Sequence, residues 1–112
     1  MVVDQDLSDV QVDRLFHALA DRTRRDILRR TLVAKPTVSE LATLYPMSFA
    51  AVQKHVAVLE GAGLVTKQHS GRTRIVRADP ETIARAQRLL DSYTELWRDR
   101  VTRLDAMLAD EN

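Results

Sequence analysis

Two spacings of hydrophobic residues alternate along this chain, and each change of spacing marks the boundary of a predicted element. The first segment has the three-to-four-residue spacing of a helix with one buried face. Its apolar residues are Val12, Leu15, Phe16 and Leu19. Ser8 and Gln11 have the types and spacing of a capping box, so the pattern predicts a helix over residues 9–20.

Two further helices are predicted next, and a proline follows each of them. Asp21 is a good N-cap residue for a helix over residues 22–34. Thr37 and Glu40 repeat the capping-box pattern at the start of a short helix over residues 37–45. Both segments therefore carry a start signal and a stop signal.

A fourth helix, residues 48–61, combines a buried stripe with a small polar face. Ser48 is its N-cap, and at about 100° per residue its large apolar side chains fall within an arc of roughly 60°. These positions are Val52, Val56 and Leu59. The other side carries Ala50, Gln53, Lys54 and Ala57. The helix is therefore predicted to be amphipathic, with a flat and basic outward face.

The spacing shortens to two residues beyond this helix. Residues 64–78 alternate on either side of Ser70 and Gly71, which predicts a β-hairpin. A long helix is predicted over residues 80–109. Proline at residue 80 is a typical first residue of a helix. The expected fold is mainly α with a small β-hairpin: about five helices and one hairpin in a single domain, residues 1–112.

Composition excludes several functions, and the distribution of charge indicates a type of partner. The chain has no cysteine, which excludes disulfides, thiolate metal sites and a cysteine nucleophile. Its apolar runs are too short to span a membrane and no signal sequence opens it, so we expect a soluble, cytoplasmic protein. The net charge is only +1, but residues 21–77 carry seven more basic than acidic residues. A basic middle between acidic ends favours a polyanionic partner.

The third and fourth helices, joined by a short turn, form a predicted helix-turn-helix, and the basic hairpin behind them makes it a winged one. In such a unit the second helix enters the major groove of double-stranded DNA. Gln53 can bond adenine through two hydrogen bonds, Lys54 can reach guanine or phosphate, and Ala50 can contact a thymine methyl. Helix N-termini would contact the DNA backbone, and the hairpin would contact either the minor groove or the backbone. The candidate DNA-binding residues are Thr37, Ser48, Ala50, Gln53, Lys54, His55, Lys67, His69, Arg72 and Arg74.

Some of these residues have a second interpretation. Gln53 and Lys54 could form an ordinary solvated face. His55 lies at the margin of the buried stripe, where it would either pack or contact DNA. Phe49 lies near the same edge, and we favour a core position for it over an apolar contact with DNA. The arginines of the second helix would either pair with neighbouring acidic residues or contact phosphate.

Three stretches carry a resemblance to a known family. LADRTRRDIL, SELATLYPMSFAAVQKHVAVLEGAGLV and the hairpin GRTRIVRAD resemble the ArsR family of bacterial winged-helix regulators, over about residues 10–108. The resemblance implies a homodimeric transcription factor, usually a repressor, that binds an inverted-repeat operator and often its own promoter. The alternatives are an activator of the same family, or a winged-helix adaptor that binds proteins and not DNA.

The long last helix is the second candidate functional element. Its large side chains recur every seven residues, a pattern that usually packs against another helix. A chain of this size has little surface to cover them, so we expect this helix and the first to form a two-fold interface. The expected interface residues are Val12, Leu15, Phe16, Leu19, Leu90, Tyr93, Trp97, Val101, Leu104 and Leu108. Otherwise the stripe would only close its own domain.

Cofactors and enzymatic activity are not expected. His17, His55 and His69 lack the spacing of metal ligands, and the last helix has no histidine, so no metal site is predicted. No glycine-rich phosphate loop or catalytic triad is present in the sequence. The chain therefore resembles the metal-independent branch of the family. A small-molecule effector is one possible partner of such a protein.

Overall fold

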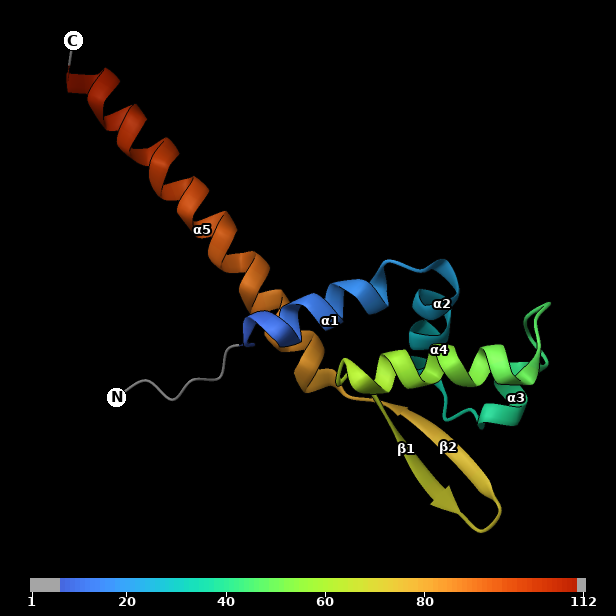
Figure 1. Cartoon of the computed structure of the whole chain (residues 1–112). Helices are drawn as coiled ribbons and strands as arrows, with labels where there is room; N and C mark the ends of the chain where they lie inside the picture. Colours follow the sequence, from blue (N-terminus) through green and yellow to red (C-terminus); the bar gives the residue numbers. More distant parts are fainter. Residues whose placement is uncertain (1–6, 111–112) are drawn as a thin grey trace.

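The computed structural model describes residues 7–110. Residues 1–6 and 111–112 of the predicted domain lie outside the described residues. Five helices and one hairpin follow one another along the chain (Figure 1). They are α1 (Asp9–Leu19), α2 (Arg22–Val33), α3 (Val38–Ala42), α4 (Phe49–Gly61), β1 (Val65–Ser70), β2 (Thr73–Ala78) and α5 (Pro80–Asp110). The predicted fold class is therefore confirmed.

Side-chain caps fix the start of the first four helices. Ser8 and Thr37 both form complete capping boxes, in which each hydroxyl accepts from the backbone N–H three residues on. Asp21 and Ser48 accept in the same way at α2 and α4. The third helix is shorter than predicted, because it ends at Ala42 and not at residue 45.

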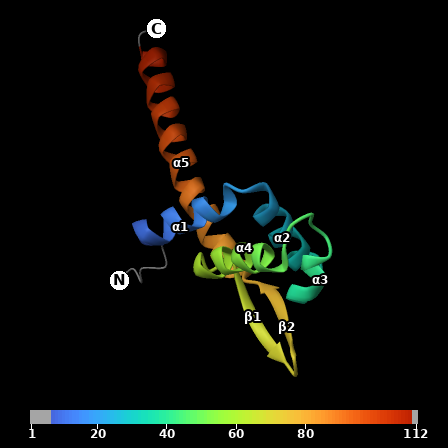
Figure 2. The same cartoon turned by 45° about the vertical axis from the view of Figure 1, so that its right-hand side comes forward.

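The core lies where α1, α2 and α3 pack around α4 with the base of the hairpin beneath (Figures 1 and 2). The buried stripe of α4 is at its centre, and all three of its predicted residues are completely buried. The core is otherwise made of aliphatic side chains from the three surrounding helices and the two strands. The first three helices and β1 therefore hold α4 in place.

The hairpin is tied to the start of α3. Ser70 and Thr73 pair across a two-residue turn. Of the two turn residues, only Gly71 has a positive φ, at +63°. A positive φ at the first central residue is the pattern of a type II′ turn, which matches the twist of antiparallel strands. The Val76 N–H donates to the Pro36 carbonyl at 2.9 Å, so β2 continues into a short bridge with the segment before α3.

Helix α5 leaves the globular part as a long rod (Figures 1 and 2). The molecule measures 71 × 36 × 24 Å and has a radius of gyration of 19.4 Å, whereas a compact domain of this length has about 13 Å. From Leu90 to Asp110 every residue is exposed except Val101, which is half-buried. The second half of α5 therefore packs against nothing in the described part of its own chain.

Candidate nucleic-acid interface

Helix α4 presents three different sides. The buried stripe faces the core, and the opposite side carries Ala50, Lys54 and Ala57, which are all exposed. Their side chains are small except for that of Lys54, so another molecule can approach the helix backbone closely there. The third side faces the hairpin and begins with Phe49 and Gln53, one helical turn apart. Of the four residues predicted for the polar side, Ala50, Lys54 and Ala57 lie on the free side of the helix, whereas Gln53 is half-buried and faces the hairpin.

A groove lies where α3, α4 and the hairpin meet. Its volume is about 180 Å³. Each of the three elements supplies part of its lining: Val38 and Ser39 from α3, Phe49 and Gln53 from α4, and Arg72, Thr73 and Arg74 from the hairpin turn and β2. The structure therefore brings the predicted Gln53, Arg72 and Arg74 together in one concave site, although about twenty residues separate them in the sequence.

The two predicted helix-start residues already serve as caps. The Ser48 hydroxyl accepts from the Ala51 N–H at 3.1 Å, and the Thr37 hydroxyl accepts from the Glu40 N–H at 3.0 Å. The remaining N–H groups of the first turn of α4 point out of the helix end, where a phosphate oxygen is a suitable acceptor. Ser48 thus sets the direction of the helix terminus whether or not it touches a ligand.

The predicted hairpin residues divide between its base and its tip. Lys67 lies near the base, where its Nζ pairs with the Glu60 carboxylate at 3.3 Å and its side chain is mostly covered. His69 is opposite Arg74 in the strand register, and both are exposed near the tip. The exposed positive charge near the tip of the hairpin is therefore that of Arg72 and Arg74.

His55 lies on the side of α4 that packs toward α1 and α2. Its Nδ1 is 3.3 Å from an Arg24 guanidinium nitrogen and 3.9 Å from an Asp21 carboxylate oxygen. The side chain is 21% exposed. Of the two interpretations left open by the sequence, this geometry favours the packed histidine.

Arginines at the start of α2 are occupied by the backbone of α1. The guanidinium of Arg24 donates to the carbonyls of Ala18 and His17 at 2.8 and 2.9 Å, and Arg25 donates to the Leu19 carbonyl at 2.8 Å. These carbonyls lie in the last turn of α1, where a helix lacks internal donors. Arg24 and Arg25 therefore join α1 to α2, a role that the sequence pattern did not indicate.

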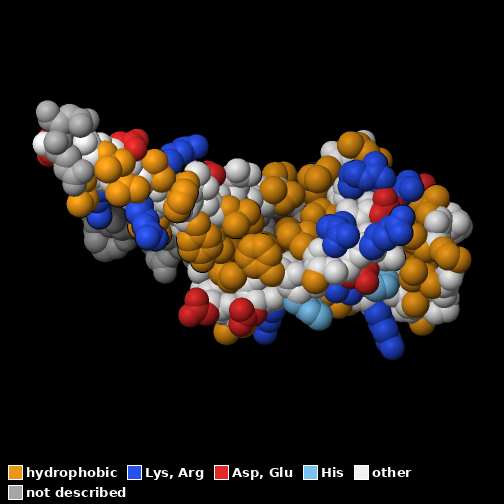
Figure 3. All heavy atoms as spheres, turned by 90° about the horizontal axis from the view of Figure 1, so that it is seen from above, with side chains coloured by type: hydrophobic (Ala, Val, Ile, Leu, Met, Phe, Trp, Pro, Cys, Tyr) orange, Lys and Arg blue, Asp and Glu red, His pale blue; other side chains and the backbone are white. Residues whose placement is uncertain are grey.

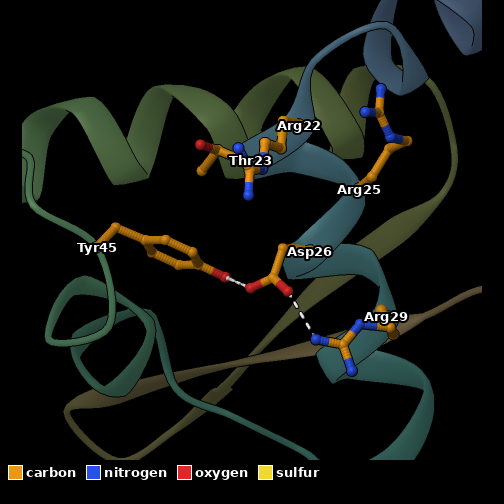
Figure 4. Close-up of a pocket in the computed structure, with 6 residues that line it drawn as sticks. All are labelled: Arg22, Thr23, Arg25, Asp26, Arg29 and Tyr45. Atoms are coloured by element: carbon orange, nitrogen blue, oxygen red, sulfur yellow. Dashed lines mark hydrogen bonds and ion pairs between the residues drawn. The ribbon is translucent and has the colours of Figure 1, made fainter.

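Asp26 is the centre of a second polar cluster (Figure 4). Its carboxylate accepts from the Tyr45 hydroxyl at 2.6 Å, from Arg29 at 2.7 Å and from Arg30 at 2.9 Å. These bonds, that from Tyr45 first, hold the pKa of Asp26 well below its usual range. Burial and the adjacent carboxylate raise the pKa of Tyr45 to about 12. The cluster ties α2 to the turn between α3 and α4.

A shallow concavity of about 430 Å³ lies beside this cluster. It is lined by the residues drawn in Figure 4: Arg22, Thr23, Arg25, Asp26, Arg29 and Tyr45. The Asp26 carboxylate lies among them, and in Figure 4 the Arg25 side chain points away from it. Arg25 donates to a neutral backbone carbonyl and Arg29 pairs with Asp26, so among the lining residues one carboxylate stands against three arginines.

Hydrophobic side chains gather in a band that runs from the rod of α5 onto the middle of the molecule (Figure 3). Exposed large apolar residues of α1 and α5 are Val10, Phe16, Leu90, Tyr93, Leu96, Trp97, Leu104, Met107 and Leu108. Val12, Leu19 and Val101 are half-buried. Leu15 is a correction to the predicted interface, because it is 1% exposed within its own core and has no surface left for a partner.

Among residues 7–110, no cluster of three or more His, Cys, Asp or Glu side chains has the geometry to hold a metal ion. Within the same residues, no helix has both the length and the apolar character needed to cross a membrane.

The groove has four lining residues that the sequence analysis did not include among the DNA-binding residues: Val38, Ser39, Phe49 and Thr73. Phe49 is 47% exposed and lines the groove, so the expectation that it belongs to the core is wrong. Ser39 is exposed on α3 and lines the same groove. The position of Phe49 at the very start of α4 is the signal that was available, because the stripe of a helix leaves the core at its ends.

The order and packing of α3, α4 and the hairpin define a winged helix-turn-helix domain. Comparison with known proteins gives the same class. The chain is 40% identical over 81 residues to the HTH-type transcriptional regulator Rv2034 of Mycobacterium tuberculosis, covering 72% of this chain and 76% of that one. No protein-family profile matches the chain.

Solved structures extend the likeness to almost the whole chain. An ArsR-like transcriptional regulator from Rhodococcus sp. RHA1 is 30% identical with a TM-score of 0.81, over 90% of this chain and 93% of that one. A homodimeric winged helix-turn-helix DNA-binding domain from Mycobacterium bovis is 26% identical with a TM-score of 0.62, over 85% and 91%. The chain belongs to the ArsR family of winged helix-turn-helix transcriptional regulators.

Proposed function

We propose that the protein binds double-stranded DNA sequence-specifically as a homodimer and represses transcription from its own promoter. It acts in the cytoplasm as a binding protein and not as an enzyme. The operator is an inverted repeat, because a two-fold dimer presents the same contact surface twice.

One observation carries the DNA-binding part of the proposal: the groove formed by α3, α4 and the hairpin. It combines Gln53, whose amide suits the major-groove edge of adenine, with the guanidinium groups of Arg72 and Arg74. Beside it, Lys54 lies exposed on the outward side of α4 between two alanines. A helix with small outward residues and flanking positive charge fits a major groove with the hairpin against the backbone.

The dimer part rests on the exposed half of α5. A rod of 21 residues, Leu90 to Asp110, is roughly 30 Å long, and its apolar stripe has no cover within the described chain. Contiguous exposed apolar surface of this kind marks an interaction site. A second copy supplies an identical stripe, so the two helices can cover each other, and the two α4 helices then lie about 34 Å apart, one turn of DNA.

The proposal is tested by measuring binding to labelled duplexes over a range of salt concentrations. One duplex carries the DNA upstream of the gene, and the other is a random sequence of the same length. We expect tighter binding to the upstream duplex, and an affinity for both that falls steeply and linearly in log–log form with salt, because phosphate contacts release counterions. Absence of binding to either duplex at low salt would instead indicate the protein-interaction adaptor.

A further inference from the structure

Phe49 is an exposed aromatic side chain at the first position of α4. Nearly half of its surface is accessible, at 47%, and it is not part of the core cluster. The Ala51 N–H donates to the Ser48 hydroxyl and caps this end of the helix, so the backbone at Phe49 is well ordered. A single exposed apolar side chain is common on protein surfaces, so the groups around Phe49 decide whether it marks a contact.

The surroundings of Phe49 indicate what covers it. It shares the groove with Gln53, which is one turn along the same side of α4. The opposite wall is basic, with Arg72 and Arg74. The groove thus offers one apolar surface, one amide that both donates and accepts, and two positive charges within a single concavity.

Duplex DNA has groups that match all three features. Phosphates pair with arginine, and the adenine edge in the major groove pairs with an amide. The apolar group on the major-groove edge of the base pairs is the C5 methyl of thymine, which phenylalanine can contact. A helical turn of about 5.4 Å between Phe49 and Gln53 is comparable to the spacing of one to two stacked bases.

We propose that Phe49 is a specificity-determining residue that contacts the C5 methyl group of a thymine next to the base that Gln53 bonds. The inference rests on the proposed DNA-binding function and adds a base preference to it. The methyl contact selects thymine over cytosine at one position of each half-site, while Arg72 and Arg74 hold the groove against the backbone.

Deoxyuridine substitution tests the contact directly, since uracil differs from thymine only by the missing methyl. After the operator has been mapped by footprinting, each thymine in it is replaced singly by deoxyuridine and binding is measured. Loss of one buried methyl corresponds to about a fourfold weaker complex. We expect this loss at one thymine per half-site, and roughly a 15-fold loss when both symmetric positions are changed.

Variants assign the effect to the side chain. In Phe49→Ala and Phe49→Gln the same deoxyuridine substitutions should have no effect, because the apolar partner is gone, and Phe49→Leu should keep part of the sensitivity. Leu44→Ala is the matched control, since Leu44 is also 47% exposed but does not line the groove, and it should keep the full sensitivity. Circular dichroism melting of each variant verifies the fold.

Three results would overturn the inference, and they differ from one another. An operator without any methyl-sensitive thymine excludes the contact, while the DNA-binding proposal stands. Methyl sensitivity that persists in both Phe49→Ala and Phe49→Gln assigns the methyl to another side chain. A protein that binds no duplex removes the proposed function together with this contact.

Discussion

Gln53 is the residue on which the proposed base recognition depends most. It is half-buried on α4, so its surroundings limit the conformations of its side chain. A side chain that is fixed before binding loses less conformational entropy when it binds. Its place in the groove with Phe49 also limits which base it can reach.

Replacing Gln53 by Ala should weaken operator binding by about 1–3 kcal/mol and relax the preference at one base pair, because a two-bond contact with adenine is lost. Competition binding against a set of operators mutated at single positions measures both effects. Gln87→Ala is the control, as Gln87 is exposed on α5 far along the chain from the groove. If affinity and preference are both unchanged, α4 does not contact bases through Gln53.

Asp26 should stabilise the fold in a pH-dependent way. Its pKa is lower in the folded protein than the usual 3.8, chiefly through the Tyr45 hydroxyl, so its contribution is fully present above about pH 4 and is lost as pH falls below that value. Asp26→Asn should lower the free energy of unfolding by about 1–2 kcal/mol at pH 7. At pH 3 the difference between wild type and variant should be smaller.

Urea unfolding at pH 7 and pH 3, at one fixed protein concentration, checks this prediction. Asp13→Asn is the matched control, because Asp13 is exposed on α1 and forms no ion pair among the described residues. A variant as stable as wild type at both pH values would show that the cluster around Asp26 contributes nothing to folding.

At the scale of elements, α3, α4 and the hairpin act as one unit because α4 is packed on all sides but one. The hydrogen bond from the Val76 N–H to the Pro36 carbonyl fixes the hairpin against the start of α3, and the Asp26–Tyr45 bond fixes the turn before α4. Rigid support of this kind places contacting side chains more precisely than a mobile loop does. The tip of the hairpin, with Arg72 and Arg74, is the exposed end of this unit.

Arg74→Ala should weaken binding to every duplex by a similar factor and reduce the salt slope by about one, because one phosphate contact is removed. Binding to the upstream and random duplexes at several salt concentrations measures the slope. Arg14→Ala on α1 serves as the charge-matched control, since Arg14 points away from the apolar side of its helix. An unchanged slope would remove Arg74 from the DNA interface.

The elements were predictable because each start has a local signal. Ser8, Asp21, Thr37 and Ser48 all cap the helices that follow them, and glycine marks the turn of the hairpin. The early end of α3 was not predictable from its proline, because the Thr43 hydroxyl bonds the Glu40 carbonyl at 2.7 Å and the chain turns there.

The site was only partly predictable, because partners distant in sequence decide how each side chain is used. Lys67 has the positive charge expected of a phosphate contact, but it pairs with Glu60. His55 lies against Arg24 from another helix. Phe49 was misjudged for a different reason: periodicity gives the direction of a side chain, but not whether another element covers the helix end.

At the scale of the whole molecule, the two proposed functions lie in different parts of the chain. The globular part carries the groove, and the rod carries the apolar stripe that we propose for dimerisation. A dimer through α5 would fix the distance between two grooves, and the inverted repeat follows from that geometry. Binding through both half-sites also raises affinity well beyond that of one groove.

Replacing Trp97 and Leu104 by Asp should give monomers, because two charges would be buried at the centre of the paired stripes. Sedimentation velocity at micromolar concentration measures the oligomeric state. Thr102→Asp adds a charge on the opposite side of α5 and should leave the dimer intact. Dimers that survive the double substitution would place the interface elsewhere on the molecule.

The mass of the complex formed with the upstream duplex tests the central claim most directly. Sedimentation of protein and labelled duplex at low salt should give a complex of two protein chains per duplex, and the Trp97→Asp and Leu104→Asp double variant should lose most of it. A duplex that sediments alone at every protein concentration, or a complex containing a single chain, would contradict the account.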